Sequence, residues 1–134
     1  MTQVIKREWE IAKTFIFEVD LRNGVIHIDW EDFERMAMEY NPSVLVKVDE
    51  EKSLGELAET ALGKVLENLV GELAGLILVI SFKKDEEIMM DELDEWNACL
   101  RRLIGEYVEI KWGLQESSDI EGRRSVMAFG FSKS

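Results

Sequence analysis

Three stretches of the chain place apolar residues three or four positions apart, which is the spacing of an amphipathic helix. The first follows Asp29, whose carboxylate can cap a helix N-terminus, and it stops at Asn41-Pro42, where helical angles are disfavoured. The second follows Ser53, and Glu56 completes a capping box with that serine. The sequence therefore predicts three helices: one between Asp29 and Asn41, one from Ser53 to Gly71 or Gly75, and one over 91–104.

Four further stretches have the pattern of β-strands. Residues 76–82 are apolar almost without a break, which is typical of a strand that is covered on both faces. Residues 107–114 alternate, with Trp112 on the apolar face of the strand. Strands are also predicted over 43–49 and 125–131. This order of helices and strands predicts an α/β fold with a four-stranded, mixed sheet.

The N-terminal residues 4–28 carry two competing patterns. The apolar residues at helical spacing are Ile5, Trp9, Ala12, Ile16 and Val19. Residues 14–19 are also rich in strand-forming types, and Asn23-Gly24 is a candidate type I′ turn between strands over 15–19 and 25–28. The local pattern leaves helix and hairpin open.

Composition narrows the class of protein. The length of 134 residues suits one domain, so we expect residues 1–134 to form a single domain. The chain has 28 acidic and 16 basic residues, a formal charge of −12, and its basic runs are no longer than two residues. Nucleic acids and anionic membranes repel such a chain, so we expect neither as a partner.

The sequence also indicates a compartment. A single cysteine, Cys99, excludes an intramolecular disulfide and fits a reducing environment. The longest uninterrupted apolar run, 76–80, is far shorter than the roughly 20 residues that cross a bilayer. The N-terminal residues lack the basic and apolar regions of a signal peptide. We therefore expect a cytoplasmic protein.

No cofactor motif is present in the sequence. It contains neither a glycine-rich phosphate loop nor a dinucleotide fingerprint. One histidine, His27, and one cysteine cannot supply a zinc or haem site, and His27 lies in no nucleophile-elbow sequence. Cys99 lies near Trp96 on a helix face, where we expect it to fill the core. We expect no metal, no cofactor and no enzymatic activity of the chain on its own.

Residues 24–33 read Gly-Val-Ile-His-Ile-Asp-Trp-Glu-Asp-Phe and resemble a loop of the FtsZ/tubulin superfamily. In FtsZ proteins this catalytic (synergy) loop reads Gly-Leu-Ile-Asn-x-Asp-Phe-Ala-Asp-Val and follows a long central helix. Later segments resemble that superfamily in the same order: 33–39 and 54–69 resemble its next two helices, 75–81 resembles Gly-x-Leu-x-Asn-Ile-Thr, 109–114 resembles Ile-Ile-Phe-Gly-Ala, and 126–131 resembles Val-Ile-Ala-Thr-Gly-Phe.

The resemblance implies a stand-alone C-terminal domain of this superfamily, without the GTP-binding domain. It implies a two-layer sandwich with helices mainly on one face of the sheet. Residues 1–23 would be an N-terminal helix resembling the end of the central helix, which favours helix over hairpin, and residues 24–32 the catalytic loop. Superfamily members bind GTP on a Gly-Gly-Gly-Thr-Gly-Ser/Thr-Gly loop at a helix N-terminus. This chain has no such sequence, so we do not expect it to bind GTP in that manner.

The resemblance also implies site residues. In the superfamily, acids of this loop approach the GTP held on the next subunit. Asp29 and Asp32 stand at the two acid positions, which implies catalysis in trans. His27, at the family's Asn position, Trp30, and Glu31, at an Ala position, are the implied binding residues. The residues alone also fit a simpler role, in which Asp29 caps the helix and the other acids favour its dipole.

Three functions follow as hypotheses. The first is an interaction module of the FtsZ-like cytoskeleton in cell division, which caps filaments of an FtsZ-like or tubulin-like GTPase or regulates it. The second is half of a split tubulin-like protein, which a large exposed apolar patch along 4–21 would favour. The third is a homo-oligomeric α/β ligand-binding protein or small enzyme, which a pocket between subunits lined by Arg101, Arg102 or Arg123 would favour. We rank the first highest.

Overall fold

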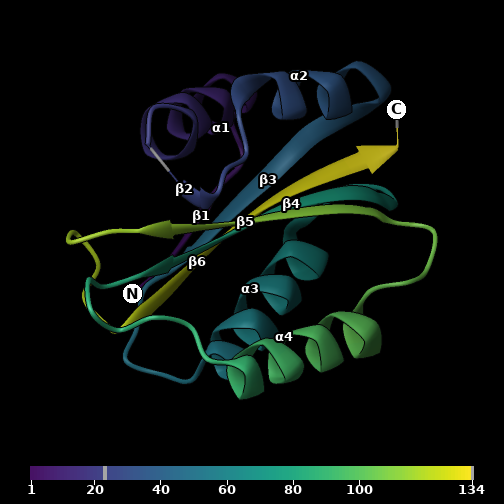
Figure 1. The fold of residues 1–134 in the computed structure, drawn as a ribbon. Coiled ribbons are helices and arrows are strands. Elements are labelled where there is room, and N and C mark those ends of the chain that lie inside the picture. The colour runs from purple at the N-terminus through teal and green to yellow at the C-terminus, as the bar shows by residue number, and fades with distance from the viewer. Residues whose placement is uncertain (23, 134) are drawn as a thin grey trace.

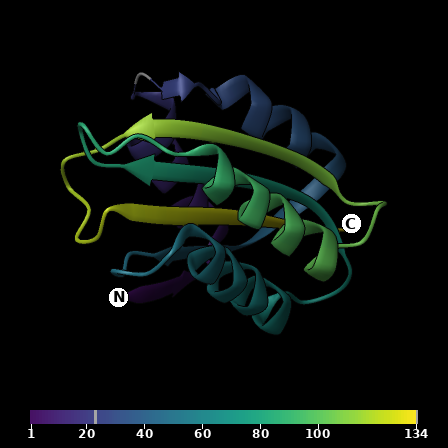
Figure 2. The same cartoon turned by 60° about the horizontal axis from the view of Figure 1, so that its bottom comes forward.

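The computed structural model describes every residue except 23 and 134. A six-stranded sheet lies between two helical layers (Figure 1). The helices α1 (Glu8–Phe15) and α2 (Trp30–Glu39) cover one face, and α3 (Leu54–Asn68) and α4 (Met90–Leu103) lie side by side on the other (Figure 2). The predicted α/β fold with a mixed sheet is confirmed. The predictions of four strands and of helices mainly on one face are wrong.

The sheet has the strand order β1-β3-β6-β4-β5-β2. In chain order the strands are β1 (Thr2–Ile5), β2 (Gly24–Ile26), β3 (Tyr40–Val48), β4 (Leu73–Phe82), β5 (Glu109–Glu116) and β6 (Arg124–Lys133). Only β4 and β5 pair in parallel among the described strands, and the other neighbours are antiparallel. The four predicted strands correspond to β3, β4, β5 and β6. The edge strand β1 was not predicted, and β2 overlaps the strand over 25–28 of the hairpin alternative.

The layer of α3 and α4 packs on the sheet through a large apolar cluster that includes Trp96 and Cys99. Ser53 Oγ accepts a hydrogen bond from the backbone N–H of Glu56, and the Glu56 carboxylate accepts one from the N–H of Ser53, as the predicted capping box requires. Burial raises the pKa of the Cys99 thiol, in keeping with its expected place in the core. Even α3, the longest helix of the described chain at 15 residues, lacks the length and apolar composition to span a bilayer, as do the others.

An aromatic cluster holds α1 and α2 on the opposite face. The ring centroid of Phe15 on α1 lies 4.8 Å from that of Phe33 on α2 and 5.3 Å from that of Phe129 on β6. Phe33 also lies 5.3 Å from Phe131, two residues further along β6. All four side chains are buried. Such tilted and edge-to-face contacts stabilise a core beyond the area they bury, so both helices are fixed on the central strand.

The N-terminal segment differs from both sequence predictions in part. Helix is confirmed over 8–20, as α1 followed by η1 (Ile16–Asp20), a five-residue π-helix, so the hairpin strand over 15–19 is wrong. The strand β1 precedes this helix, whereas the resemblance implied helix alone. The predicted Asn23-Gly24 turn falls partly on residue 23, outside the described residues. The segment that resembles the catalytic loop begins as β2, which pairs with β5, and becomes helical at Trp30.

Candidate functional site

Asp29 and Asp32, which stand at the implied catalytic positions, form the start of α2. Asp29 Oδ1 accepts a hydrogen bond from the backbone N–H of Asp32 at 3.1 Å. Asp32 Oδ2 accepts one from the backbone N–H of Asp29 at 3.0 Å. This capping box satisfies two N–H groups, one of which the start of the helix would leave unpaired. The capping role that the residues alone predicted for Asp29 is therefore present.

Lys111 on β5 makes a further contact with these acids. Its Nζ lies 2.9 Å from Asp32 Oδ1, and both side chains are about one-quarter to one-third exposed. Burial raises the pKa of Asp32, but the hydrogen bond and charge of Lys111 and the bonds to Asp29 outweigh burial, so the pKa lies below its ordinary value. Lys111 is 79 positions from Asp32 in the chain, and only the pairing of distant strands places it there.

The three implied binding residues have different environments. The ring of Trp30 stacks on Phe33, with centroids 5.1 Å apart and an interplanar angle of 15°, so much of it belongs to the aromatic cluster. His27 is exposed. Glu31 is exposed and forms an ion pair with Arg35 one turn along α2, at 3.2 Å. The structure thus gathers Asp29, Asp32 and Lys111 into one contact network and leaves His27 and Glu31 on the surface.

Four large apolar side chains near the N-terminus are mostly exposed. One lies on α1, one on η1, one just after η1 and one on β2. They are Trp9 (61%), Phe17 (60%), Leu21 (65%) and Val25 (69%), and we call them the apolar face. Trp9 and Phe17 line one shallow groove together with Ile5 of the edge strand β1. Single exposed apolar residues are common in proteins. Trp9, Phe17 and Leu21 lie within 4–21, the segment where an exposed apolar patch would favour the split-protein hypothesis, and Trp9 and Phe17 share one groove.

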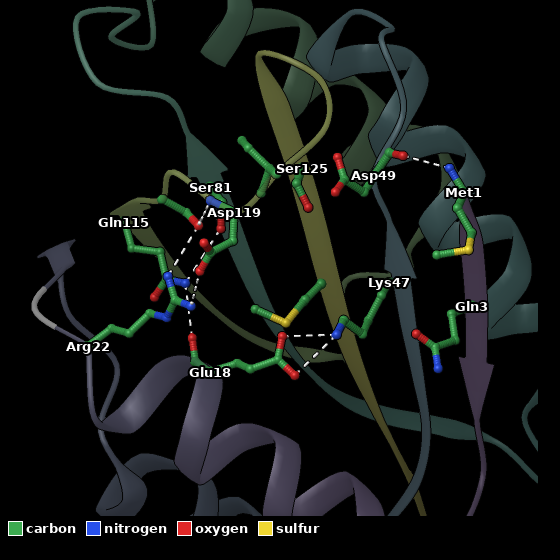
Figure 3. Close-up of a pocket in the computed structure, with 13 residues that line it drawn as sticks. Met1, Gln3, Glu18, Arg22, Lys47, Asp49, Ser81, Gln115, Asp119 and Ser125 are labelled. Atoms are coloured by element: carbon green, nitrogen blue, oxygen red, sulfur yellow. Dashed lines mark hydrogen bonds and ion pairs between the residues drawn. The ribbon is translucent and has the colours of Figure 1, made fainter.

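A polar cavity of about 160 Å³ lies between η1 and one end of the sheet (Figure 3). Lys47 of β3, Ser81 of β4, Gln115 of β5 and Ser125 of β6 contribute to its wall, and Glu18 of η1 faces them. Ser81 and Gln115 are 4% exposed and Ser125 is 8% exposed, so they are polar residues at positions where sheets are usually apolar. The same face of the sheet is apolar under α1 and α2.

Two contacts of Glu18 join η1 to the cavity wall. Its carboxylate oxygens lie 2.9 and 3.1 Å from Lys47 Nζ, and its backbone carbonyl accepts a hydrogen bond from Gln115 Nε2 at 3.0 Å. π-helical turns are rare and occur often at functional sites. The sequence pattern did not predict this cavity, because six separate segments build it: η1, the four strands β3 to β6, and the N-terminal segment with Met1 and Gln3. One sequence feature points to the cavity: Ser81, which lines it, is a polar residue within the apolar stretch 76–82.

The arginines named for an anion pocket do not meet in one place. Arg102 lines a cavity between α3 and α4 and pairs with Glu59 at 3.4 Å. Arg123 lines a different cavity near the start of β6 and pairs with Glu51 at 3.6 Å. Arg102 and Arg123 each have a carboxylate partner within the chain, and Arg101 is exposed on α4. A pocket between subunits that involves one of them stays a prediction.

The fold of this chain is similar to part of two solved FtsZ structures. Comparison with family models and with curated proteins gives no match. Among solved structures, an empty FtsZ dimer from M. jannaschii has a TM-score of 0.56 and 17% identity over 89% of this chain. A mutant of FtsZ from M. jannaschii has a TM-score of 0.51 and 16% identity, also over 89%.

These matches use only part of the FtsZ chains. This chain spans about a third of their length, 35% and 36% respectively. A thiamine monophosphate kinase from Aquifex aeolicus matches more weakly, with a TM-score of 0.46 and 13% identity over 91% of this chain and 40% of the kinase. The described residues therefore have an FtsZ-like α/β fold, consistent with the C-terminal-domain fold that the sequence resemblance implies.

Proposed function

We propose that this chain is an FtsZ-like interaction module that binds an FtsZ-like GTPase through the apolar face. The observation that supports the proposal is the exposure of Trp9, Phe17, Leu21 and Val25 on a chain with an FtsZ-like fold. Grouped, exposed apolar side chains mark protein interaction sites, and large aromatic anchors carry much of the affinity at such interfaces. A partner that covers this face removes these side chains from water.

The charge distribution favours the same face. Residues 1–23 contain four basic and four acidic residues, so the formal charge of −12 resides in the rest of the chain. An acidic partner surface is repelled by most of this molecule but not by this segment. Because the segment also resembles the end of the superfamily's central helix, the partner that fits best supplies a nucleotide-binding domain, as the split-protein hypothesis requires.

A second candidate is capping of a filament through the start of α2, with Asp29 and Asp32 acting in trans on the partner's GTP. Its support is that Lys111 lies 2.9 Å from Asp32 and offsets one negative charge where a polyphosphate would approach. His27 and Glu31 are exposed beside these acids and would meet the partner first. If the chain caps filaments in this way, filaments that bind it stop growing.

One experiment separates the two candidates. A purified FtsZ-like GTPase from the same source is captured on the immobilised chain, and polymer mass and GTPase rate are measured in parallel. Trp9→Ser with Phe17→Ser removes two anchors of the apolar face. His27→Ala with Glu31→Ala removes two exposed side chains beside the acids and is the matched control.

We expect capture to be lost with the first pair and kept with the second. Loss with the second pair alone, together with reduced polymer mass by the wild type, supports capping instead. If the wild type captures no GTPase and leaves polymer mass and GTPase rate unchanged, both candidates are refuted.

A further inference from the structure

The floor of the polar cavity is a row of side chains across four neighbouring strands. Lys47 on β3 lies opposite Met127 on β6, and Ser81 on β4 lies opposite both Ser125 on β6 and Gln115 on β5. Residues at the same level of adjacent strands point to one face of the sheet. The row therefore faces η1, where α1 and α2 no longer cover the sheet, and polar side chains replace the apolar core.

The hydroxyl of Ser125 is the free polar group of this floor. Ser125 is 8% exposed, lines the cavity, and forms no hydrogen bond with any described residue. By contrast, Lys47 is engaged with Glu18, and the Gln115 amide donates to the Glu18 carbonyl. Because this hydroxyl is open to the cavity and has no partner among the described residues, water or a hydrogen-bonding ligand in the cavity can pair with it.

The charges around the cavity restrict the kind of ligand. Lys47 and Arg22 are positive, and Glu18, Asp49 and Asp119 are negative. A simple anion meets three carboxylates, and a simple cation meets an ammonium and a guanidinium group, so either is repelled by part of the wall. Among residues 1–22 and 24–133, no cluster of three potential metal ligands occurs, which argues against a metal ion here.

We propose that this cavity binds a small zwitterion, namely an amino acid with a short side chain. The ligand's carboxylate accepts hydrogen bonds from Lys47 Nζ and the Ser125 hydroxyl, and its ammonium group donates to the Glu18 carboxylate. The ion pair between Lys47 and Glu18, with Nζ and Oε1 2.9 Å apart, opens to admit it. Each charge keeps an opposite charge as its partner, so the exchange leaves no charge unpaired.

The size of the cavity and the shape of η1 agree with such a ligand. A cavity of about 160 Å³ is about ten times the roughly 15 Å³ that a single water needs, so it has room for a small ligand such as glycine, alanine or serine. The π-helical turn of η1 presents both the carboxylate and the backbone carbonyl of Glu18 to the floor. Figure 3 shows the Glu18 carboxylate and Lys47 Nζ joined as an ion pair, with Ser125 above them in the view.

The test is a titration of the ¹⁵N-labelled chain with glycine, L-alanine and L-serine, each to about 10 mM, followed by NMR. Propionate, ethylammonium and glycerol at equal concentration are the matched probes with one charge or none. We expect at least one amino acid to cause saturable shifts of the Gln115 side-chain amide and of the Ser81 and Ser125 backbone amides. The three matched probes should cause none.

Ser125→Ala removes a hydroxyl that has no partner, so the free chain should keep its spectrum while the Kd for the amino acid rises about fivefold. The control is Ser132→Ala on the same strand, which loses a hydrogen bond to Ser43 (Oγ to Oγ, 2.6 Å) outside the cavity and should leave Kd unchanged. The proposal is overturned if no amino acid gives saturable shifts, if a matched probe binds as tightly, or if Ser125→Ala leaves Kd unchanged.

Discussion

Replacing Asp32 by alanine should destabilise the chain because this side chain connects the start of α2 to β5. The carboxylate accepts one bond from the Asp29 backbone N–H at 3.0 Å and one from Lys111 Nζ at 2.9 Å. A capping interaction contributes about 1 kcal/mol, and a partly buried charged hydrogen bond contributes about the same. We therefore expect Asp32→Ala to lower the free energy of unfolding by about 2 kcal/mol, twice the effect of a typical cap.

The assay is urea unfolding followed by circular dichroism, with Asp29→Ala and the double variant measured alongside. Asp29→Ala loses only the cap, at about 1 kcal/mol. The double variant should lose less than the sum, because both acids belong to one capping box. Glu31→Ala, in the same turn but exposed, is the control and should change stability by less than about 0.5 kcal/mol. If Asp32→Ala is as mild as this control, the contacts of Asp32 do not stabilise the fold.

The pH dependence of stability independently tests whether the charged form of Asp32 stabilises the fold. The pKa of Asp32 is lowered in the folded chain, against the effect of burial, by Lys111 and by its bonds to Asp29. A lowered pKa means that the folded state favours the carboxylate, so its stabilisation is complete above the ordinary value of 3.8 and is lost as pH falls below it. The stability gap between wild type and Asp32→Asn should therefore be constant near neutral pH and shrink in acid. If this stability gap widens as pH falls, the folded state does not favour the charged carboxylate of Asp32, which contradicts the lowered pKa.

Substitutions at two buried positions, Arg124 and Trp96, test the packing of α4. Arg124 is 3% exposed and binds both carboxylate oxygens of Glu92, at 2.9 and 3.0 Å, so Arg124→Met should lower the free energy of unfolding by about 3 kcal/mol in urea. Adding Glu92→Met should recover most of this loss, and a double variant no better than the single one would contradict that reasoning. Trp96 is fully buried and its Nε1 has no partner in the described chain. Trp96→Phe should stay within about 1 kcal/mol of wild type, because removing an unpaired donor offsets the lost volume, whereas Trp96→Ala should lose about 3–5 kcal/mol. If Trp96→Phe and Trp96→Ala lower the free energy of unfolding equally, the unpaired indole N–H does not cost the fold the stability assumed here.

Local signals account for the parts of the fold that the sequence predicted. Ser53 and Glu56 stand three residues apart before an apolar helical pattern, and the structure has the capping box there. Asp29 was predicted as a cap on the same grounds, and its carboxylate accepts the N–H of Asp32. Such features depend on neighbours within one turn, so a single sequence contains all the information they need.

The parts that were missed depend on residues far apart in the chain. The strand β1 has four residues, and its Ile5 also fits the helical pattern that follows, so its identity comes from pairing with β3. The strand β2 overlaps the strand over 25–28 of the hairpin alternative, but it pairs with β5, Ile26 opposite Leu114, and not with residues 15–19. The contact between Lys111 and Asp32 has the same origin. No periodic pattern records which strands become neighbours, and the polar cavity is built across those neighbours.

The most direct test of the apolar face as the docking surface is hydrogen–deuterium exchange on the chain alone and with an FtsZ-like GTPase from the same source. Partner binding slows exchange where it covers or orders the backbone. We expect partner binding to slow exchange of the backbone amides along α1, η1 and β2 and to leave exchange along α3 and α4 unchanged. Exchange that is unchanged on α1, η1 and β2 in a mixture that forms a complex, with protection at the start of α2 instead, would contradict it.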